Sequence, residues 1–354
     1  MRKLKARTWV VSFAALVLVL VLLFSALVYL IDPFFQFRVK DNAYMLSAWF
    51  VGSGLIENYD YDTLILGSSM TQNFDMDVFR RELGAKPLHV GLSDMRVPEL
   101  SDLIHVAYDA KRAERYYICV DLTVFTKDDT ESRYPAYLLK KDPLSRLRYF
   151  LSYEAWFRYI PIDLSFMLLD GLEVELPEKF AASRSIDLLE DYRADVVYGK
   201  DIVLSNYISG AYAVSAVDTE NLYQRMCVHI DDYLASFDFE KGDHRFFFPP
   251  YSSLYWCDSQ DYGYFDVYMR AKAYFVARAA VLGATVYDFQ CTELAMDLDN
   301  YKDTTHYSPE INDWMVRCFA KGDYLATPEN CDSFREKLME NTQRFREAYA
   351  ELFD

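Results

Sequence analysis

The amino-acid sequence predicts an α/β protein, a three-layer αβα sandwich with a mainly parallel sheet, preceded by an N-terminal transmembrane helix. Short apolar runs alternate with segments of helical spacing over residues 62–126 and again over residues 240–325. Parallel strands are buried on both faces and need a crossover connection, so this alternation favours a parallel sheet covered by helices on both faces. The transmembrane helix is predicted by an apolar run without a single charge over residues 9–31.

The apolar run of residues 9–31 is 23 residues long and follows a basic tail, residues 1–8, with four cations. A helix of this length measures roughly 34 Å, which is enough to cross a hydrocarbon core of about 30 Å. The basic tail predicts a cytoplasmic N-terminus, and hence a single-pass cell-membrane protein with an extracytoplasmic domain. A cleaved signal peptide is the alternative. Its apolar region is normally about 7–15 residues long and ends in small residues, whereas this run ends in Tyr29-Leu30-Ile31.

Charge is unevenly distributed along the chain. Of 354 residues, 37 are Lys or Arg and 54 are Asp or Glu, which gives a net charge of −17; without the four cations of residues 1–8 the remainder carries −21. Nucleic acid binding needs clustered cations, so this balance argues against a nucleic-acid partner. Apolar residues at 52% and charged residues at 26% are ordinary globular usage and exclude wholesale disorder. The six cysteines are too sparse for a disulfide scaffold, and Cys318 with Cys331 is the pair we expect.

The expected strands and helices fall into two blocks. The first block holds strands at residues 63–66, 88–90 and 116–120, with helices at 75–84 and 97–110. The second holds a helix at 219–236, a strand at 245–248, a helix at 264–281, a strand at 285–289 and a helix after Pro309. Turn-forming residues such as Gly67 and Gly91 end the strands.

The remaining segments complete one α/β domain with an insertion. Residues 32–61 are predicted to be a linker, residues 127–239 an insertion after the third strand, and residues 326–354 a C-terminal helix. A helix expected at residues 144–159 mixes arginines with aromatic residues. Such a segment can lie on the bilayer, dock a membrane partner or cover a site as a lid, and its composition leaves these alternatives open.

A serine at the end of the first strand has the setting of a nucleophile. Ser69 follows Gly67-Ser68 at the carboxyl end of that strand, the edge at which ligands bind in open parallel sheets. A serine at a tight strand-to-helix turn exposes its hydroxyl in front of backbone N–H groups that can hold a developing oxyanion. The alternative is structural, because Ser and Thr are also favoured helix caps.

Two of the five histidines follow an aspartate by three residues, and their positions distinguish them. Asp102 and His105 lie in an expected helix, where this spacing gives an ordinary surface pair. Asp303 and His306 lie in a polar loop between the last strand and the last core helix, so His306 can face the sheet edge that carries Ser69. We therefore predict Ser69 as nucleophile, His306 as general base, and Asp303 as the carboxylate that orients His306.

Taken in order, these motifs resemble those of the SGNH (GDSL-like) hydrolase superfamily, whose fold is flavodoxin-like. Gly67-Ser68-Ser69 resembles the family's Gly-Asp-Ser block, with Ser68 in place of Asp, and Asp303-x-x-His306 resembles its last block. The resemblance is closest to the membrane-anchored branch, which includes the D-alanyl transfer protein of teichoic-acid modification and the alginate O-acetylation proteins. It covers residues 62–126 and 245–320 but not the insertion.

Two departures affect the oxyanion hole that this resemblance implies. The second block normally supplies a glycine N–H, for which Gly91 is the candidate and the Ser93-Asp94 peptide the alternative. The third block normally supplies an asparagine, but the matching strand end carries Asp121. An ionised carboxylate cannot donate a hydrogen bond. Either the Asp121 position has another role, or the hole relies on the N–H groups of Ser69 and Gly91, and each missing donor typically lowers turnover by about 100- to 1,000-fold.

The resemblance implies an extracytoplasmic serine esterase or O-acyltransferase that acts on an acylated glycan or cell-envelope polymer through an acyl-enzyme. It also implies that an integral-membrane O-acyltransferase often supplies the acyl group. We expect no cofactor and no metal, because the sequence has no His/Cys cluster, calcium loop or Gly-rich phosphate loop. Two other hypotheses stay open: a non-catalytic SGNH-like binding or scaffold protein of envelope polysaccharide assembly, which Asp121 favours, and phosphodiester or sulfate chemistry.

Overall fold

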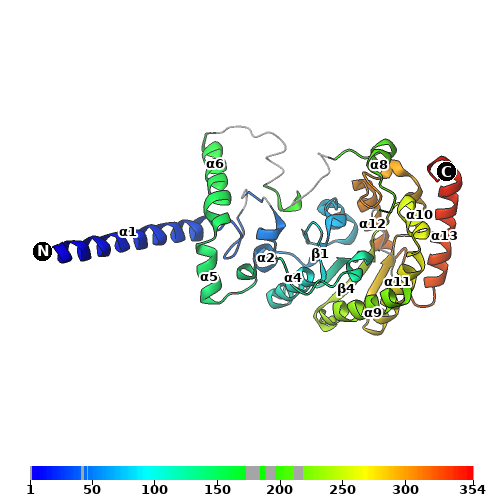
Figure 1. Ribbon diagram of the computed structural model, residues 1–354, viewed down its shortest axis with the longest axis horizontal. Coiled ribbons are helices and arrows are strands. Elements are labelled where there is room, and N and C mark those ends of the chain that lie inside the picture. The colour runs from blue at the N-terminus through cyan, green and yellow to red at the C-terminus, as the bar shows by residue number, and fades with distance from the viewer. Residues whose placement is uncertain are drawn as a thin grey trace. The chain divides into compact units, whose positions relative to one another are not determined.

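The computed structural model describes residues 2–40, 44–45, 47–172, 184–188, 196–210 and 218–353. The chain divides into two compact units (Figure 1). Unit 1 comprises Met1–Tyr59 and Tyr134–Leu189, and unit 2 comprises Asp60–Arg133 and Glu190–Asp354. Parts of the expected insertion, residues 173–183, 189–195 and 211–217, lie outside the described residues.

Unit 2 is built on a five-stranded sheet in which every strand pair is parallel. The strands are β1 (Thr63–Gly67), β2 (Pro87–Gly91), β3 (Arg115–Cys119), β4 (Asp243–Phe248) and β5 (Thr285–Asp288). Their order, β2-β1-β3-β4-β5, is that of flavodoxin-like doubly wound sheets, in which the connections change direction between β1 and β3. The predicted α/β fold with a parallel sheet is confirmed.

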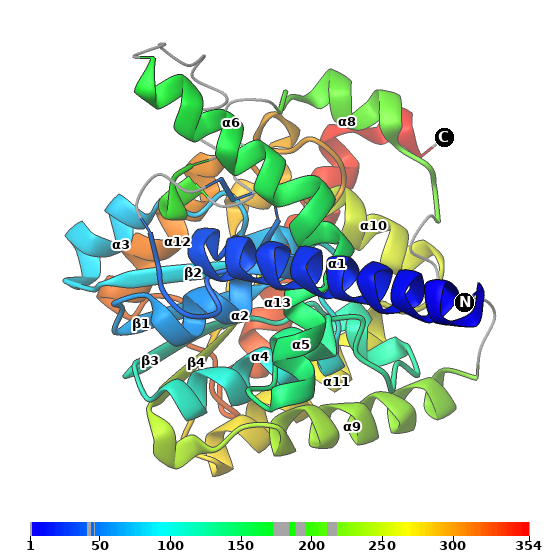
Figure 2. The same ribbon diagram turned by 90° about the vertical axis from the view of Figure 1, so that its left-hand side faces the viewer.

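Helices cover both faces of this sheet (Figure 2). Successive side chains of a strand point to opposite faces. Tyr117 of β3 accordingly packs on Phe79 and Phe319, whereas its neighbour Tyr116 packs on Tyr108. The first face carries α3 (Met76–Leu83) and α12 (Pro309–Lys321), and the second carries α4 (Val97–Ala110), α9 (Thr219–Ala235) and α11 (Phe265–Val281).

The described part of unit 2 also contains α8 (Lys200–Asn206), α10 (Ser253–Asp261) and α13 (Cys331–Ala348). The last of these is the expected C-terminal helix, whereas the sequence pattern did not predict α8 or α10. All six cysteines are free, so the expected pairing of Cys318 with Cys331 is wrong. Cys318 is buried on α12, which packs on the sheet, and Cys331 begins α13.

Unit 1 is helical in its described part. It contains α1 (Arg2–Ile31), α2 (Ala48–Asn58), α5 (Pro143–Phe150), a π-helical turn (Ala155–Tyr159) and α6 (Ile160–Gly171). Within α1, the stretch Ala6–Ile31 is long and apolar enough to cross a membrane, and most of its side chains are exposed. Aromatic rings form the core next to the end of α1: Phe34 packs on Phe50, Tyr149 and Tyr159.

Asp32 fixes the path of the chain as it leaves α1. Its backbone is in the left-handed region, with φ +46°. Its buried carboxylate accepts hydrogen bonds from the N–H groups of Gln36, Phe37 and Arg38 and from the Tyr149 hydroxyl. Burial raises the pKa of this carboxyl more than these donors lower it. Asp32 thus joins the segment after α1 to α5.

The two units differ from the parts expected from the sequence. The expected linker, residues 32–61, contains α2 and lies almost entirely in unit 1. The expected insertion, residues 127–239, is divided between the units, because residues 134–189 pack with α1 and α2 whereas residues 190–239 contribute α8 and α9 to unit 2. The physical reason is that α2 finds its partners in the segment after Tyr134. Phe50 packs on Tyr159, the Ser53 N–H donates to the Tyr134 hydroxyl, and the Ser53 hydroxyl donates to the Leu138 carbonyl.

Candidate active site

Side chains that follow β1, β2, β3 and β4 line one cavity in unit 2, with a volume of about 470 Å³. Its position agrees with the rule that ligands bind beyond the carboxyl ends of parallel strands, next to the switch point of the sheet. The lining includes Ser68, Ser69, Asp94, Met95, Asp121, Thr123, Lys127, Tyr251, Tyr255, Tyr268, Thr305 and His306.

Ser69 begins a 3₁₀ turn (Ser69–Thr71) directly after β1, and its neighbour Ser68 is the cap of that turn. The Ser68 hydroxyl oxygen accepts from the Met70 N–H (3.3 Å), and the Thr71 hydroxyl donates to the Ser68 carbonyl (2.9 Å). A Cβ at Gly67 would lie 2.5 Å from Thr71 Cγ2, so the tight turn requires glycine there. The capping role that competed with the nucleophile hypothesis therefore belongs to Ser68, which leaves the Ser69 hydroxyl available.

A buried histidine, His89, forms a hydrogen bond with this turn. His89 Nε2 lies 2.9 Å from the Thr71 hydroxyl oxygen. That hydroxyl already donates to the Ser68 carbonyl, so it accepts from a protonated Nε2 of His89. Burial lowers the pKa of His89 to about 4, which keeps the ring neutral at physiological pH. Nothing in the sequence pattern around His89 indicates this contact.

The structure brings the three predicted residues Ser69, His306 and Asp303 into one hydrogen-bonded series. Ser69 Oγ lies 2.7 Å from His306 Nε2, and His306 Nδ1 lies 2.8 Å from Asp303 Oδ2. Because the carboxylate accepts the Nδ1 proton, Nε2 carries the lone pair that can accept the Ser69 proton. This arrangement is the geometry of a serine nucleophile, its base and an orienting acid.

The Asp303 carboxylate is held in its ionised form. Oδ1 accepts from the N–H groups of Thr305 (2.9 Å) and His306 (2.8 Å) and from the Thr305 hydroxyl (3.1 Å). Burial raises the pKa of Asp303, but the hydrogen bonds from His306 and Thr305 outweigh it and hold the pKa well below its usual range. The other pair of the same spacing differs, because His105 Nδ1 contacts the Ser101 carbonyl (2.6 Å) on the exposed surface of α4.

Of the two expected oxyanion-hole donors, Ser69 lines the cavity and Gly91 does not. Gly91 is buried at the end of β2, where an added Cβ would lie 2.7 Å from His89 Nε2. Asp94 and Met95 line the cavity instead, and Asp94 has a left-handed backbone, φ +53°. Among the described residues, the N–H groups of Ser69 and Asp94 have no hydrogen-bond acceptor. Asp94, from the alternative to Gly91, is thus the residue of this segment that lines the cavity with a free N–H group among the described residues.

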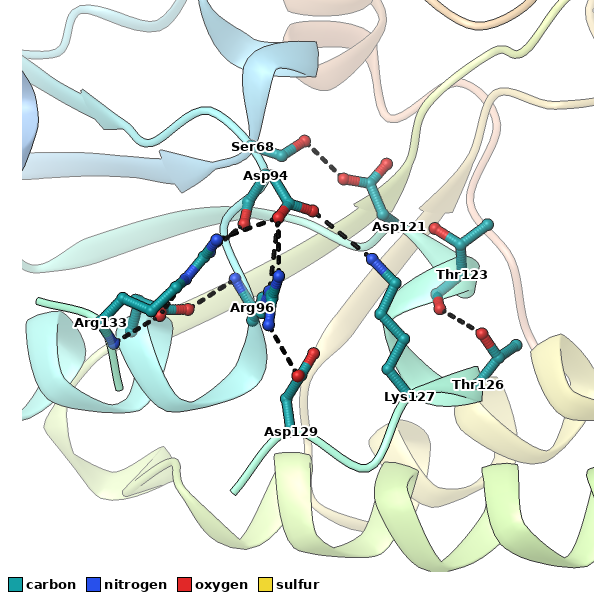
Figure 3. Close-up of polar contacts among 10 residues, drawn as sticks. Ser68, Asp94, Arg96, Asp121, Thr123, Thr126, Lys127, Asp129 and Arg133 are labelled. Carbon is teal, nitrogen blue, oxygen red and sulfur yellow. Dashed lines mark hydrogen bonds and ion pairs between the residues drawn. The ribbon is translucent and has the colours of Figure 1, made fainter. Parts of the chain in front are cut away.

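Asp121 uses both carboxylate oxygens as acceptors, and Figure 3 shows the contact with Ser68. The Ser68 hydroxyl donates to Oδ2 at 2.5 Å, and the Tyr251 hydroxyl donates to Oδ1 at 2.6 Å. Burial and the nearby Asp121 charge raise the pKa of Tyr251 well above its ordinary value, so this phenol stays a donor. Asp121 therefore orders two hydroxyl groups at the cavity wall and supplies no hydrogen to a bound oxyanion.

A group of ion pairs lies beside the cavity, on the loop after β2 (Figure 3). The Asp94 carboxylate lies 3.0 Å from Arg133 Nη1, 3.2 Å from Arg96 Nη2 and 3.5 Å from Lys127 Nζ. Burial raises the pKa of Asp94, but these cations outweigh it and lower the pKa overall. Asp94 and Lys127 line the cavity, so a bound molecule would meet both charges. The only sequence signal for this group was the position of Asp94 just after the second strand.

Within the described ranges, no group of three or more His, Cys, Asp or Glu side chains is arranged to hold a metal ion. A scan of the chain against models of known protein families finds no match, and no curated protein is similar to it in sequence. The resemblance to the SGNH hydrolases consequently rests on the chain's own motifs.

Proposed function

We propose that this chain is an extracytoplasmic, membrane-anchored serine esterase or O-acyltransferase that acts on an acylated glycan or cell-envelope polymer. The observation that supports this function best is the series Ser69, His306 and Asp303, with Ser69 and His306 at the wall of a cavity of about 470 Å³. The proposed cytoplasmic N-terminus follows from the basic residues before the apolar stretch of α1.

In this proposal Ser69 Oγ attacks the carbonyl carbon of an ester as His306 Nε2 takes the hydroxyl proton. In the proposal the negative charge that develops on the carbonyl oxygen is held by the N–H groups of Ser69 and Asp94, two residues that line the cavity and whose N–H groups have no acceptor among the described residues. His306 then gives its proton to the departing alkoxide, which leaves an acyl-Ser69 ester. Asp303 holds the imidazolium in orientation throughout and does not itself take the proton.

The acyl group then passes to an acceptor hydroxyl. His306 removes a proton from water or from a sugar hydroxyl, which attacks the acyl-Ser69 carbonyl and releases the serine. Water as acceptor makes the protein an esterase, and a sugar hydroxyl makes it an O-acyltransferase. The resemblance to the membrane-anchored SGNH branch favours an integral-membrane O-acyltransferase as the source of the acyl group.

A second candidate function, a non-catalytic SGNH-like scaffold of envelope polysaccharide assembly, is favoured by Asp121. Its two oxygens already hold the hydroxyl groups of Ser68 and Tyr251, and a carboxylate beside a developing oxyanion raises the barrier to acyl transfer. The two candidates differ in whether Ser69 reacts.

Ester hydrolysis by the full-length protein in detergent tests the proposal. We expect p-nitrophenyl acetate to be hydrolysed, and Ser69→Ala to lower kcat/KM by at least about 1,000-fold because the nucleophile is lost. Ser205→Ala is the matched control and should keep the original rate, because it removes an exposed hydroxyl that donates to the Ile202 carbonyl of its own helix. An unchanged rate in Ser69→Ala would exclude the acyl-enzyme mechanism.

A further inference from the structure

The helices of unit 1 that follow Tyr134 expose apolar side chains on one side. On α5 and just after it these are Leu144, Leu147 and Leu151, and on α6 and just after it they are Leu164, Met167, Leu168 and Leu172. Spacings of three and four residues place each set on one face of its helix. The inward side of α6 carries the buried carboxylate of Asp163, which accepts the Tyr44 N–H at 3.0 Å. The exposed apolar side chains of α6 therefore lie opposite a buried side that Ile160, Asp163 and Phe166 form.

This apolar surface is continuous with α1. Trp156 of the π-helical turn stacks on Phe24 with 4.7 Å between ring centroids, and its indole N–H donates to the Phe150 carbonyl. Phe24 precedes Ile31, the end of α1, by seven residues, which is about 10 Å along the helix axis. A segment that packs on Phe24 therefore lies at the depth of the bilayer if α1 crosses it. Figure 1 shows α5 and α6 crossing α1 at this end.

The aromatic and arginine side chains beside this surface are those typical of a membrane interface. Tyr153 and Phe157 flank Trp156 and are exposed, and aromatic residues concentrate at the boundary between hydrocarbon and water. Arg148 and Arg158 are also exposed, and arginines at this level pair with lipid phosphates while their stems lie along apolar chains.

We propose that this surface, the exposed apolar side chains of α5, the π-helical turn and α6, is immersed in the lipid interface of the bilayer beside α1. Its occupant is lipid, because the surface continues the exposed apolar surface of α1 without a break at Phe24 and Trp156 and is accompanied by exposed aromatic and arginine side chains. The inference rests on the membrane crossing of α1 in the proposed function, and it is independent of the chemistry of Ser69.

Lipid-dependent quenching of a fluorophore tests this placement in the full-length chain reconstituted into phosphatidylcholine nanodiscs. The background carries Cys227→Ser and Cys331→Ser, which remove the two cysteines that are not buried. Single NBD labels are then placed through Met167→Cys on the surface, Leu20→Cys on the exposed side of α1 and Val281→Cys at the exposed end of α11, a position that is 80% exposed.

We expect the label at position 167 to be quenched by doxyl-labelled lipid, as at position 20, and to be protected from iodide by about fivefold relative to position 281. Iodide quenching at 167 equal to that at 281, without quenching by doxyl lipid, overturns the proposal. If 167 is shielded only in native membranes that contain other proteins, the occupant is a protein and the proposal also fails. Absence of doxyl quenching at position 20 would instead show that α1 does not cross the bilayer. That result would overturn the proposed membrane anchor as well as the placement of this surface.

Discussion

The Ser69 hydroxyl lies 2.7 Å from Nε2 of His306, although 237 positions separate the two residues in the chain. They meet because β1 and β5 are parallel members of one sheet, so the turn after β1 and the loop that precedes α12 emerge at the same edge. The Tyr307 hydroxyl, which donates to the Met70 carbonyl at 2.7 Å, ties this loop to the turn. The sheet and the hydrogen bond of Tyr307 therefore both fix the position of His306 relative to Ser69.

Replacing the carboxylate that orients His306 should remove most of the activity without unfolding the protein. In Asp303→Asn the side-chain amide can present its N–H to Nδ1 and select the wrong tautomer, which lowers turnover by about 10⁴-fold in serine enzymes of this design. Asp102→Asn is the matched control, because Asp102 precedes a histidine by the same spacing on the surface of α4. Hydrolysis of p-nitrophenyl acetate measures both variants, and equal losses would contradict the assigned role of Asp303.

Asp121→Asn should increase turnover by at least about tenfold, because an amide removes the negative charge at the cavity wall and adds a donor. The remaining amide oxygen still accepts from Ser68 or Tyr251, so the wall keeps part of its order. Asp121→Ala is the comparison, because it removes the charge without adding a donor. A fall in kcat in Asp121→Asn as large as that in Asp121→Ala would show that the carboxylate itself is required.

Acidification should destabilise unit 2 through His89. Burial lowers the pKa of His89 from its ordinary value of 6.5 to about 4, so between these two pH values the unfolded chain binds a proton that the folded chain does not. Stability is therefore lost as the pH falls through this window, by roughly 3 kcal/mol in total, and the contribution is constant above it.

The comparison of His89→Gln with the unchanged protein isolates this contribution, since an amide keeps a donor for Thr71 but does not titrate. Guanidinium unfolding in detergent at pH 7 and pH 4.5, followed by tryptophan fluorescence, measures the difference. We expect a smaller loss of unfolding free energy on acidification in the variant. An identical pH dependence in both proteins would show that His89 does not cause the loss of stability on acidification.

Removing one partner of the buried ion pair between α11 and β5 should destabilise unit 2. Lys272 Nζ lies 2.6 Å from Asp288 Oδ2, and the two side chains are 6% and 2% exposed. Lys272→Met leaves the Asp288 carboxylate buried without its cation and should cost about 3–5 kcal/mol of unfolding free energy. The double variant Lys272→Met with Asp288→Leu should recover most of this loss, and a double variant as unstable as the single one would contradict the explanation.

The sheet of unit 2 was largely predictable, because each strand is a short apolar run with a clear end. Residues 63–66 form part of β1 and residues 245–248 part of β4, and the helix expected at 97–110 is α4. The positions of Ser69 and His306 followed from the same strand ends, without any need for side-chain detail. Parallel topology was sufficient to bring them to one edge.

Contacts that depend on partners distant in sequence were not predictable. Nothing in the pattern around residues 32–61 indicates that Asp32 accepts the Tyr149 hydroxyl, so this segment looks like a linker although it is part of a folded unit. From the sequence, Asp121 likewise shows only that the expected asparagine donor is missing. Its contacts with Ser68 and Tyr251 form only when the strands have assembled into the sheet. Asp94 takes the position at the cavity that was expected of Gly91. This position goes with a left-handed backbone at a non-glycine residue, which sequence spacing does not reveal.

Covalent labelling of Ser69 tests the proposed acyl-enzyme mechanism most directly. The full-length protein is treated with a fluorophosphonate, which reacts with serines activated by a neighbouring base, and is examined by intact-protein and peptide mass spectrometry. We expect one adduct, located on Ser69, that forms in Ser205→Ala but not in Ser69→Ala and forms far more slowly in Asp303→Asn. Folded protein that stays unlabelled, or that is labelled at another serine, would contradict it.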